Sequence, residues 1–415
     1  EQATAGRAAF ADPYLAPDDA PLARALVVDY EQEAGRLDAL LCEGAQPGRP
    51  AQVLEDRLCV AGLFGDDGLE AAFPYPWADP DDPASYDLAA ADDDLARILV
   101  SGADVVVQLG GAGASGTRAG LSPARWADVA RHIVMHYNDA WASGYRYGIR
   151  YWEVGGGTTS GRVADRCELL TAAVRALKAH DPGLKVGGVA LPDGAGLPDL
   201  EALLACLAER EARPGFFSWR FDGGGGPLAL AAMERSVEGL LERYGFGDAE
   251  VFAHWSPPPG PPGDGGAYQA AHLAAALAYA QDTRLAGVCL SWADPEVPER
   301  VAQTLRLLGT LKDTPRRLIA AGGDDLGFAL LAARSEDGRL ARMLVADTGS
   351  RSEEYRLGLA GFPPGFRYTV TEISGSCPAE VIAQGSDAQL PEGVLTLPWR
   401  SPAVHLIEMV WGDRP

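Results

Sequence analysis

Five predicted strands end in short segments that could carry the chemistry of this protein, because parallel strands present their carboxyl ends at one edge of a sheet. The segments read QLGGAG (108–113), EVGGGTT (153–159), SWRFDGGGG (218–226), AHWSPPP (253–259) and SWADPE (291–296). They are rich in glycine and tryptophan and poor in acids and bases. The few ionisable residues in them therefore decide which chemistry the sequence predicts.

Acid–base chemistry would fall to His254, with Arg220 or Asp294 as its partner. Carboxylates also stand near strand ends, at Glu153, Asp222, Asp294 and Glu296. Each of these residues also has a structural interpretation. Glu153 is typical of a buried supporting acid, the aspartates are typical of loop caps, and His254 is typical of a hydrogen-bonded pocket histidine.

Four tryptophans lie at or near the same strand ends: Trp152, Trp219, Trp255 and Trp292. Aromatic faces pack well against the apolar C–H faces of sugars, so the four could form a carbohydrate site. They could equally be core residues that fill the space at this edge of the sheet. The sequence leaves both interpretations open.

Three further patterns carry less weight. GAGASG (111–116) matches a dinucleotide-binding fingerprint, but the next predicted helix begins only near Ser122, and no second strand ends in an acid about 20 residues on. His132 and His136 have metal-ligand spacing on a helix but lack a third ligand. The six cysteines show no C-x-x-C spacing, and buried, reduced thiols are favoured over disulfides or zinc. We expect no metal and no cofactor.

The elements that position these residues alternate between strand and helix from about residue 100 to 315. Predicted strands are 103–110, 148–154, 184–191, 215–221, 249–255 and 285–292, with helices such as 122–141 and 164–180 between them. Near-continuous apolar strands alternating with helices indicate a parallel sheet covered by helices, and five or six such units favour a (β/α)8 TIM barrel.

After residue 316 the pattern changes to short strands separated by glycine, proline and aspartate turns, which predicts an accessory antiparallel β-sandwich. ALVVDY (25–30) is a strand that comes too early for the barrel and is expected to join the sandwich. The predicted organisation is an N-terminal segment over 1–37, a barrel over 38–315 and a β-sandwich over 316–415.

A resemblance to a known family becomes specific in HYNDAWASGYRYGIRYWEVGGG (136–157) and LLTAAVRALKAHDPGLKVGGVAL (169–191). Together with FPYPWADPDDPASYD (73–87), FFSWRF (216–221) and the C-terminal strands, they resemble glycoside hydrolase family 39, the β-xylosidase and α-iduronidase-like retaining enzymes. The resemblance covers roughly residues 25–410. It implies a barrel with a β-sandwich built from both chain ends, and hydrolysis of glycosides with retention.

The same resemblance implies that both catalytic glutamates are missing. The family motif Trp-Glu-x-Trp-Asn-Glu-Pro, whose last Glu is the acid/base, aligns with Trp152–Thr158 and places Gly155, Gly156 and Gly157 at its Trp, Asn and catalytic Glu. The family nucleophile in Glu-Trp-Asn aligns with His254. Glycine cannot carry a proton, and imidazole is an unusual glycosyl nucleophile.

Two other family motifs have also lost polar residues. Arg-Leu-Gly-Glu aligns with Gln108–Gly111, and Ser-Trp-His aligns with Ser218, Trp219 and Arg220. We therefore expect no intact catalytic residues. The predicted ligand pocket contains Gln108, Trp152, Glu153, Gly156, Gly157, Trp219, Arg220, Asp222, His254, Trp255, Trp292 and Asp294.

Composition limits the partners. The net charge of -23 repels nucleic acid and anionic membrane surfaces, and no apolar run is long enough to span a bilayer. No signal-peptide pattern is present, which favours a cytoplasmic location over a secreted mature form without deciding it.

The sequence predicts a non-catalytic carbohydrate-binding or scaffold protein, a pseudoglycosidase. The alternative is an active carbohydrate-processing enzyme, either a glycosidase or an enzyme with altered chemistry, that uses His254 and other carboxylates in the same pocket. Homo-oligomerisation and assembly with a partner protein stay open.

Overall fold

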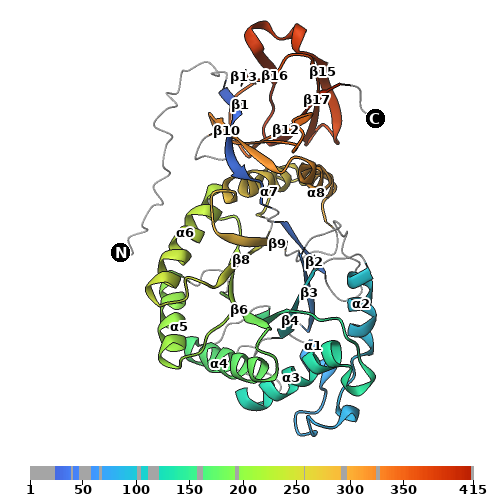
Figure 1. The fold of residues 1–415 in the computed structure, drawn as a ribbon, viewed down its shortest axis with the longest axis vertical. Helices are drawn as coiled ribbons and strands as arrows, with labels where there is room; N and C mark the ends of the chain where they lie inside the picture. Colours follow the sequence, from blue (N-terminus) through green and yellow to red (C-terminus); the bar gives the residue numbers. More distant parts are fainter. Residues whose placement is uncertain are drawn as a thin grey trace, which may run out of the picture.

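The computed structural model describes residues 24–38, 41–45, 58–64, 68–100, 104–110, 121–156, 162–191, 196–256, 258–290, 297–323 and 328–412. Within these residues the chain forms a closed parallel barrel and a nine-stranded sheet. Figure 1 shows the barrel in the lower part of the view and the sheet above it. The predicted fold class, a (β/α)8 TIM barrel with an accessory β-sandwich domain, is confirmed.

Eight parallel strands close the barrel because β2 pairs with both β3 and β9. The strands are β2 (Leu41–Ala45), β3 (Leu58–Phe64), β4 (Asp104–Gly110), β5 (Tyr151–Gly156), β6 (Lys185–Leu191), β7 (Phe216–Phe221), β8 (Glu250–Trp255) and β9 (Leu285–Leu290). The helices are α1 (Gly68–Ala72), α2 (Ala89–Val100), α3 (Pro123–Asp139), α4 (Val163–His180), α5 (Leu197–Glu209), α6 (Leu228–Arg243), α7 (Ala267–Ala280) and α8 (Glu299–Thr310).

The start of α3 shows how local chemistry places a helix. Ser122 is extended and its hydroxyl accepts a hydrogen bond from the backbone N–H of Arg125, while Pro123 occupies the first helical turn. Among the described residues, no helix is both long and apolar enough to cross a bilayer.

The second unit is one continuous, curled sheet in the order β15-β14-β17-β12-β11-β10-β1-β13-β16. Its strands are β1 (Arg24–Arg36), β10 (Arg316–Ala321), β11 (Ala329–Arg334), β12 (Leu340–Asp347), β13 (Glu354–Ala360), β14 (Phe366–Ser374), β15 (Glu380–Ser386), β16 (Val394–Pro398) and β17 (Ala403–Trp411). The N-terminal β1 lies third from one edge of the sheet, antiparallel to β10 and parallel to β13, so the sheet is not wholly antiparallel.

Helix α7 lies between the two units, beside the sheet in Figure 1. Its sequence AYQAAHLAAALAYA is rich in alanine; ten of its 14 residues are buried and none is exposed. A helix that is apolar all round must be covered on every side. Small side chains let helices α6 and α8 and the sheet strands β11, β12 and β17 approach it closely. Leu331, Leu344 and Leu406 of the sheet belong to the same core as the barrel.

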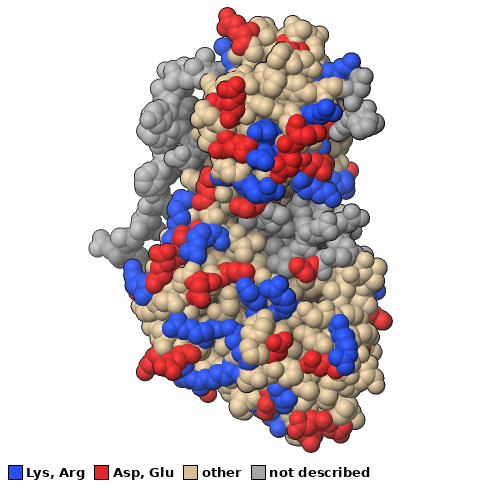
Figure 2. Space-filling model, viewed as in Figure 1, with Lys and Arg blue, Asp and Glu red and all other residues tan. Residues whose placement is uncertain are grey.

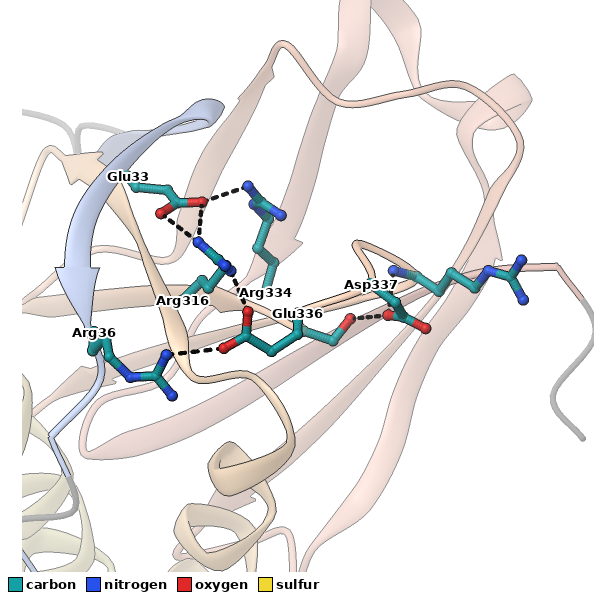
Figure 3. Close-up of polar contacts among 8 residues, drawn as sticks. Glu33, Arg36, Arg316, Arg334, Glu336 and Asp337 are labelled. Atoms are coloured by element: carbon teal, nitrogen blue, oxygen red, sulfur yellow. Dashed lines mark hydrogen bonds and ion pairs between the residues drawn. The ribbon is translucent and has the colours of Figure 1, made fainter.

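Charges of both signs are interspersed over the face shown in Figure 2. On the sheet, Glu33 accepts from Arg316 and Arg334 at 3.1 and 2.5 Å, and Glu336 pairs with Arg36 and Arg316 at 2.9 and 2.5 Å. Figure 3 shows these side chains bridging β1, β10 and the turn after β11. The pairs tie the N-terminal strand to the C-terminal part of the chain.

One cysteine prediction is wrong. Cys167 on α4 and Cys206 on α5 form a disulfide across a sequence separation of 39 residues. Neighbouring barrel helices bring the two residues together, which sequence spacing alone could not reveal. Cys289 and Cys377 are buried free thiols, as expected. The side chains of Cys42 and Cys59 lie outside the described residues.

Candidate functional site

The barrel interior is built in layers because alternate residues of each strand point inward. One layer is apolar and aromatic, formed by Val106, Tyr151, Phe216, Phe252 and Cys289. Two residues further along β4, β5, β7 and β8, each strand places a polar residue inside. These residues, Gln108, Glu153, Ser218 and His254, form the next layer toward the carboxyl ends of the strands.

Glu153 is the centre of that polar layer. Its Oε1 accepts a hydrogen bond from Ser218 Oγ at 2.5 Å and lies 2.9 Å from His254 Nε2. Its Oε2 accepts from the amide of Gln108 at 3.0 Å. The side chains of Glu153 and His254 are only 1% and 5% exposed. Four strands therefore contribute to one buried polar cluster, which we call the Glu153 cluster.

The electrostatics of the Glu153 cluster favour an ionised carboxylate. Burial alone would raise the pKa of Glu153, and it is the largest single effect. The charge and hydrogen bond of His254, with the hydrogen bonds from Ser218 and Gln108, outweigh it and hold the pKa of Glu153 below its ordinary value. An ionised carboxylate only accepts, so His254 Nε2 carries the proton of their hydrogen bond.

Glycines make room for Glu153. Gly188 on β6 has φ of +102°, and a Cβ there would lie 2.5 Å from Glu153 Cγ. Gly155 on β5 has φ of 83° and is the extra residue where the pairing shifts from Leu109–Val154 to Gly110–Gly156. A bulge of this kind favours glycine because L-residues disfavour positive φ. Gly155 therefore has a backbone reason to be glycine.

Comparison with solved structures defines the architecture around this cluster. A glucosidase from Croceicoccus marinus aligns at 24% identity over 95% of this chain and 100% of its own, with a TM-score of 0.76. A monomeric β-xylosidase from Caulobacter crescentus CB15 aligns at 17% identity over 94% and 100%, with a TM-score of 0.66. The GH39 enzyme from Xanthomonas axonopodis pv. citri aligns at 15% identity over 95% and 98%, with a TM-score of 0.68.

The chain has the fold of family 39 glycoside hydrolases. No protein-family model and no curated protein matches its sequence. The likeness is therefore one of fold, and it extends over nearly the whole chain.

In this family 39 fold, three of the predicted pocket tryptophans do not face the barrel interior. Trp152, Trp219 and Trp255 are 0%, 4% and 0% exposed and belong to the core between strands and helices. The indole N–H of Trp152 donates to the carbonyl of Ile149, and that of Trp255 donates to His272 Nδ1. Each alternates with an inward residue, so when Glu153 points inward its neighbour Trp152 must point outward. Their faces are occupied by the protein itself.

Other predicted pocket residues are placed as follows. Arg220 is half-buried and lies opposite His254 in the β7–β8 register. Asp222 is exposed and accepts a hydrogen bond from the backbone N–H of Gly224 at 2.8 Å, the contact of a loop cap. Gly156 ends β5 opposite Gly110. Gly157, Trp292 and Asp294 lie outside the described residues.

The helical histidine pair is engaged in separate contacts. His132 contacts the carbonyl of Asp128 at 2.9 Å and the carboxylate of Asp81 at 3.0 Å. His136 contacts the carbonyl of Trp141 and Asp92 Oδ1, both at 3.0 Å. Across the described ranges, no group of three or more His, Cys, Asp and Glu residues is arranged to hold a metal ion.

Sequence reasoning missed Ser218 and Gly188 as members of the site. Ser218 was visible in the segment SWRF, two residues before Arg220, and strand alternation alone puts both on the same side of β7. Gly188 carried no such signal. Its role depends on the close approach of β6 to Glu153, which is a property of the assembled barrel.

Proposed function

We propose that this chain is a family-39-like protein that has lost retaining glycosidase activity and acts as a non-catalytic carbohydrate-binding or scaffold protein. A retaining glycosidase needs two carboxyl groups about 5 Å apart, one to protonate the leaving oxygen and one to attack the anomeric carbon. The resemblance aligns Gly157 and His254 with these two positions.

The observation that carries the proposal is the engagement of His254. At the nucleophile position stands an imidazole whose Nε2 is bonded to the buried carboxylate of Glu153. This contact uses the carboxylate that could otherwise have replaced the missing nucleophile. Glu153 itself is closed in by three donors, so both groups support each other rather than a reacting sugar.

A panel of aryl glycosides tests this proposal. We expect the native protein to hydrolyse these substrates no faster than buffer does. The double variant Gly157→Glu/His254→Glu should hydrolyse them faster than the native protein. Thermal unfolding of both proteins controls for folding. Native turnover at an ordinary glycosidase rate would contradict the loss of activity.

One observation favours a second candidate, an enzyme with altered chemistry. The 2.9 Å contact with the carboxylate of Glu153 fixes the orientation of the His254 ring, as carboxylates do beside catalytic histidines. His254 would then act as the acid–base group of a reaction other than double displacement. Any native turnover that His254→Gln abolishes, while Gly157→Glu leaves it unchanged, would favour this candidate over the first.

A further inference from the structure

The segment 73–87 between α1 and α2 has a feature that the barrel interior does not explain. Tyr75 and Trp77 are 56% and 79% exposed. They are the aromatic residues among the large exposed apolar side chains of the described chain. Their ring centroids lie 5.5 Å apart at an interplanar angle of 45°. We call this pair the aromatic tip. The segment lies at the lower end of Figure 1, away from the curled sheet.

The backbone of the aromatic tip is held from both sides. Arg125 on α3 donates to the carbonyl of Pro76 at 2.7 Å and also to the carbonyl of Ala78. Its guanidinium therefore binds the backbone on both sides of Trp77. The N–H of Ala78 donates to the carbonyl of Tyr75 at 2.9 Å, which closes a turn. The two prolines before Tyr75 and Trp77 restrict the chain further.

The base of the segment is anchored in the core. Phe73 is 1% exposed and packs on Tyr86 with ring centroids 5.0 Å apart. Tyr86 packs against Trp141 and donates its hydroxyl hydrogen to the carbonyl of Pro80 at 3.0 Å. Folding therefore fixes a loop whose two outer rings contribute little burial of their own. An exposed tryptophan on a fixed backbone loses little conformational freedom when it binds a ligand.

The surroundings of the aromatic tip are acidic. Asp79, Asp81 and Asp82 are exposed beside it, and Figure 2 shows acidic side chains at the lower tip of the molecule. Asp79 and Asp82 each use one carboxylate oxygen to cap a backbone N–H. Carboxylates accept hydrogen bonds from hydroxyl groups, and the net charge of -23 disfavours polyanions.

We infer that the aromatic tip is a second carbohydrate site, separate from the barrel interior, on which neutral sugar units of a glycan chain stack. This inference rests on the proposed carbohydrate binding and names its ligand class and place. Two rings are too few for a protein interface, which typically uses 20–30 residues on each side. They suit the flat apolar face of one or two sugar units, whose hydroxyl groups meet the surrounding acceptors.

Affinity gel electrophoresis tests the inference. The full chain is run in gels that contain soluble xylan, mixed-linkage β-glucan, galactomannan or, as an acidic polymer, polygalacturonate. We expect retardation by at least one neutral polymer and none by polygalacturonate. Trp77→Ala and Tyr75→Ala should each weaken the apparent affinity by about tenfold. Val381→Ala, an exposed apolar residue on the curled sheet, should leave affinity unchanged.

The outcomes separate this site from the barrel. Binding that survives Trp77→Ala/Tyr75→Ala would overturn the inference. The inference would also be overturned if none of the neutral polymers retards the native protein. In either case, the barrel interior is tested independently by titrating the protein with short oligosaccharides. Binding that is lost in His254→Ala would place these ligands in the barrel. If instead the double variant loses affinity for a polylysine peptide while its glycan binding is unchanged, the tip is a site for cations and the inference fails. Equal melting temperatures confirm that all variants fold.

Discussion

Glu153 shows how a buried charge can be maintained at the level of one residue. Its carboxylate accepts from three side chains on three other strands, and its pKa lies below the ordinary value despite complete burial. A buried carboxylate is tolerated only when such donors compensate its lost hydration. The cost of removing it therefore comes mainly from the donors that it leaves unpaired.

We expect Glu153→Ala to lower the free energy of unfolding by about 3–5 kcal/mol, because the charged or polar groups of His254, Ser218 and Gln108 lose their acceptor. Urea titration at pH 7 measures the change. Glu209→Ala, on the exposed side of α5, should stay within about 0.5 kcal/mol of the native value. Equal effects of the two substitutions would show that the Glu153 cluster does not stabilise the barrel.

His272 predicts a pH dependence of stability. It is fully buried on α7, and burial lowers its pKa from 6.5 to about 4, with the backbone of Gly223 offsetting part of the effect. The unfolded chain therefore binds a proton at a higher pH than the folded chain does. Stability from this residue is full above about pH 6.5 and falls toward pH 4, by about 3 kcal/mol.

Chemical denaturation at pH 7, 6, 5 and 4 measures this effect, and the variant His272→Gln should show a shallower decline between pH 6.5 and 4. Gln can still accept the hydrogen bond from the indole of Trp255. Glu153 affects stability at a lower pH than His272 does. Its folded pKa is depressed, so its contribution is lost only as pH falls below about 4.3, its unfolded value. Parallel curves for the native protein and the variant would refute the assignment to His272.

At the level of elements, a covalent link joins two neighbouring helices of the barrel. The disulfide between Cys167 on α4 and Cys206 on α5 restricts the unfolded chain over a separation of 39 residues. Cys167 is fully buried, and its helix neighbours Leu170 and Val174 belong to the barrel core. The link therefore fixes α4 and α5 against each other beside strands β5 and β6.

Replacing both cysteines, in Cys167→Ala/Cys206→Ala, should lower the free energy of unfolding by about 2–4 kcal/mol through the loss of that restriction. Thermal and denaturant unfolding without reductant give the measurement, and peptide mapping without reduction should recover the 167–206 pair. Cys377→Ala, at a buried free thiol, is the control that keeps the link. A native protein that reductant does not destabilise would contradict the prediction.

At the level of the whole molecule, Arg342 joins the sheet to the barrel. It lies on β12, is 4% exposed, and donates to Glu408 Oε2 at 2.9 Å and Asp313 Oδ2 at 3.0 Å. It also donates to the carbonyl of Thr310 at the end of α8. The ion pairs of Figure 3, by contrast, are mostly solvent-accessible. Exposed pairs typically contribute about 0–1 kcal/mol.

Arg342→Ala should therefore lower the free energy of unfolding by about 1.5–3 kcal/mol, because it removes the charge-assisted hydrogen bonds of a buried guanidinium to Glu408 and to the carbonyl of Thr310. Arg36→Ala, at a residue whose side chain is 68% exposed, should cost at most about 1 kcal/mol. Guanidinium unfolding compares the two, and limited proteolysis should show faster cleavage between barrel and sheet in Arg342→Ala. Equal costs would mean that the barrel and the sheet do not depend on this contact.

The sequence by itself determined the architecture and which residues of a strand share a side. Apolar strands alternating with helices require a parallel sheet covered on both faces, and Ser122 and Pro123 fix where α3 begins, because these effects act over a few residues. The period of two along β5 likewise places Glu153 and Trp152 on opposite sides of the strand, although the sequence alone did not say which side is the interior.

Only the tertiary structure decided what those residues touch. Closure of the barrel brings Gln108, Glu153, Ser218 and His254 together from strands up to 146 residues apart in the chain, and it turns the tryptophans toward the helices. It also joins Cys167 to Cys206 and leaves Trp77 exposed on a fixed loop. Contacts between distant segments depend on the packing of the whole chain, which local patterns do not encode.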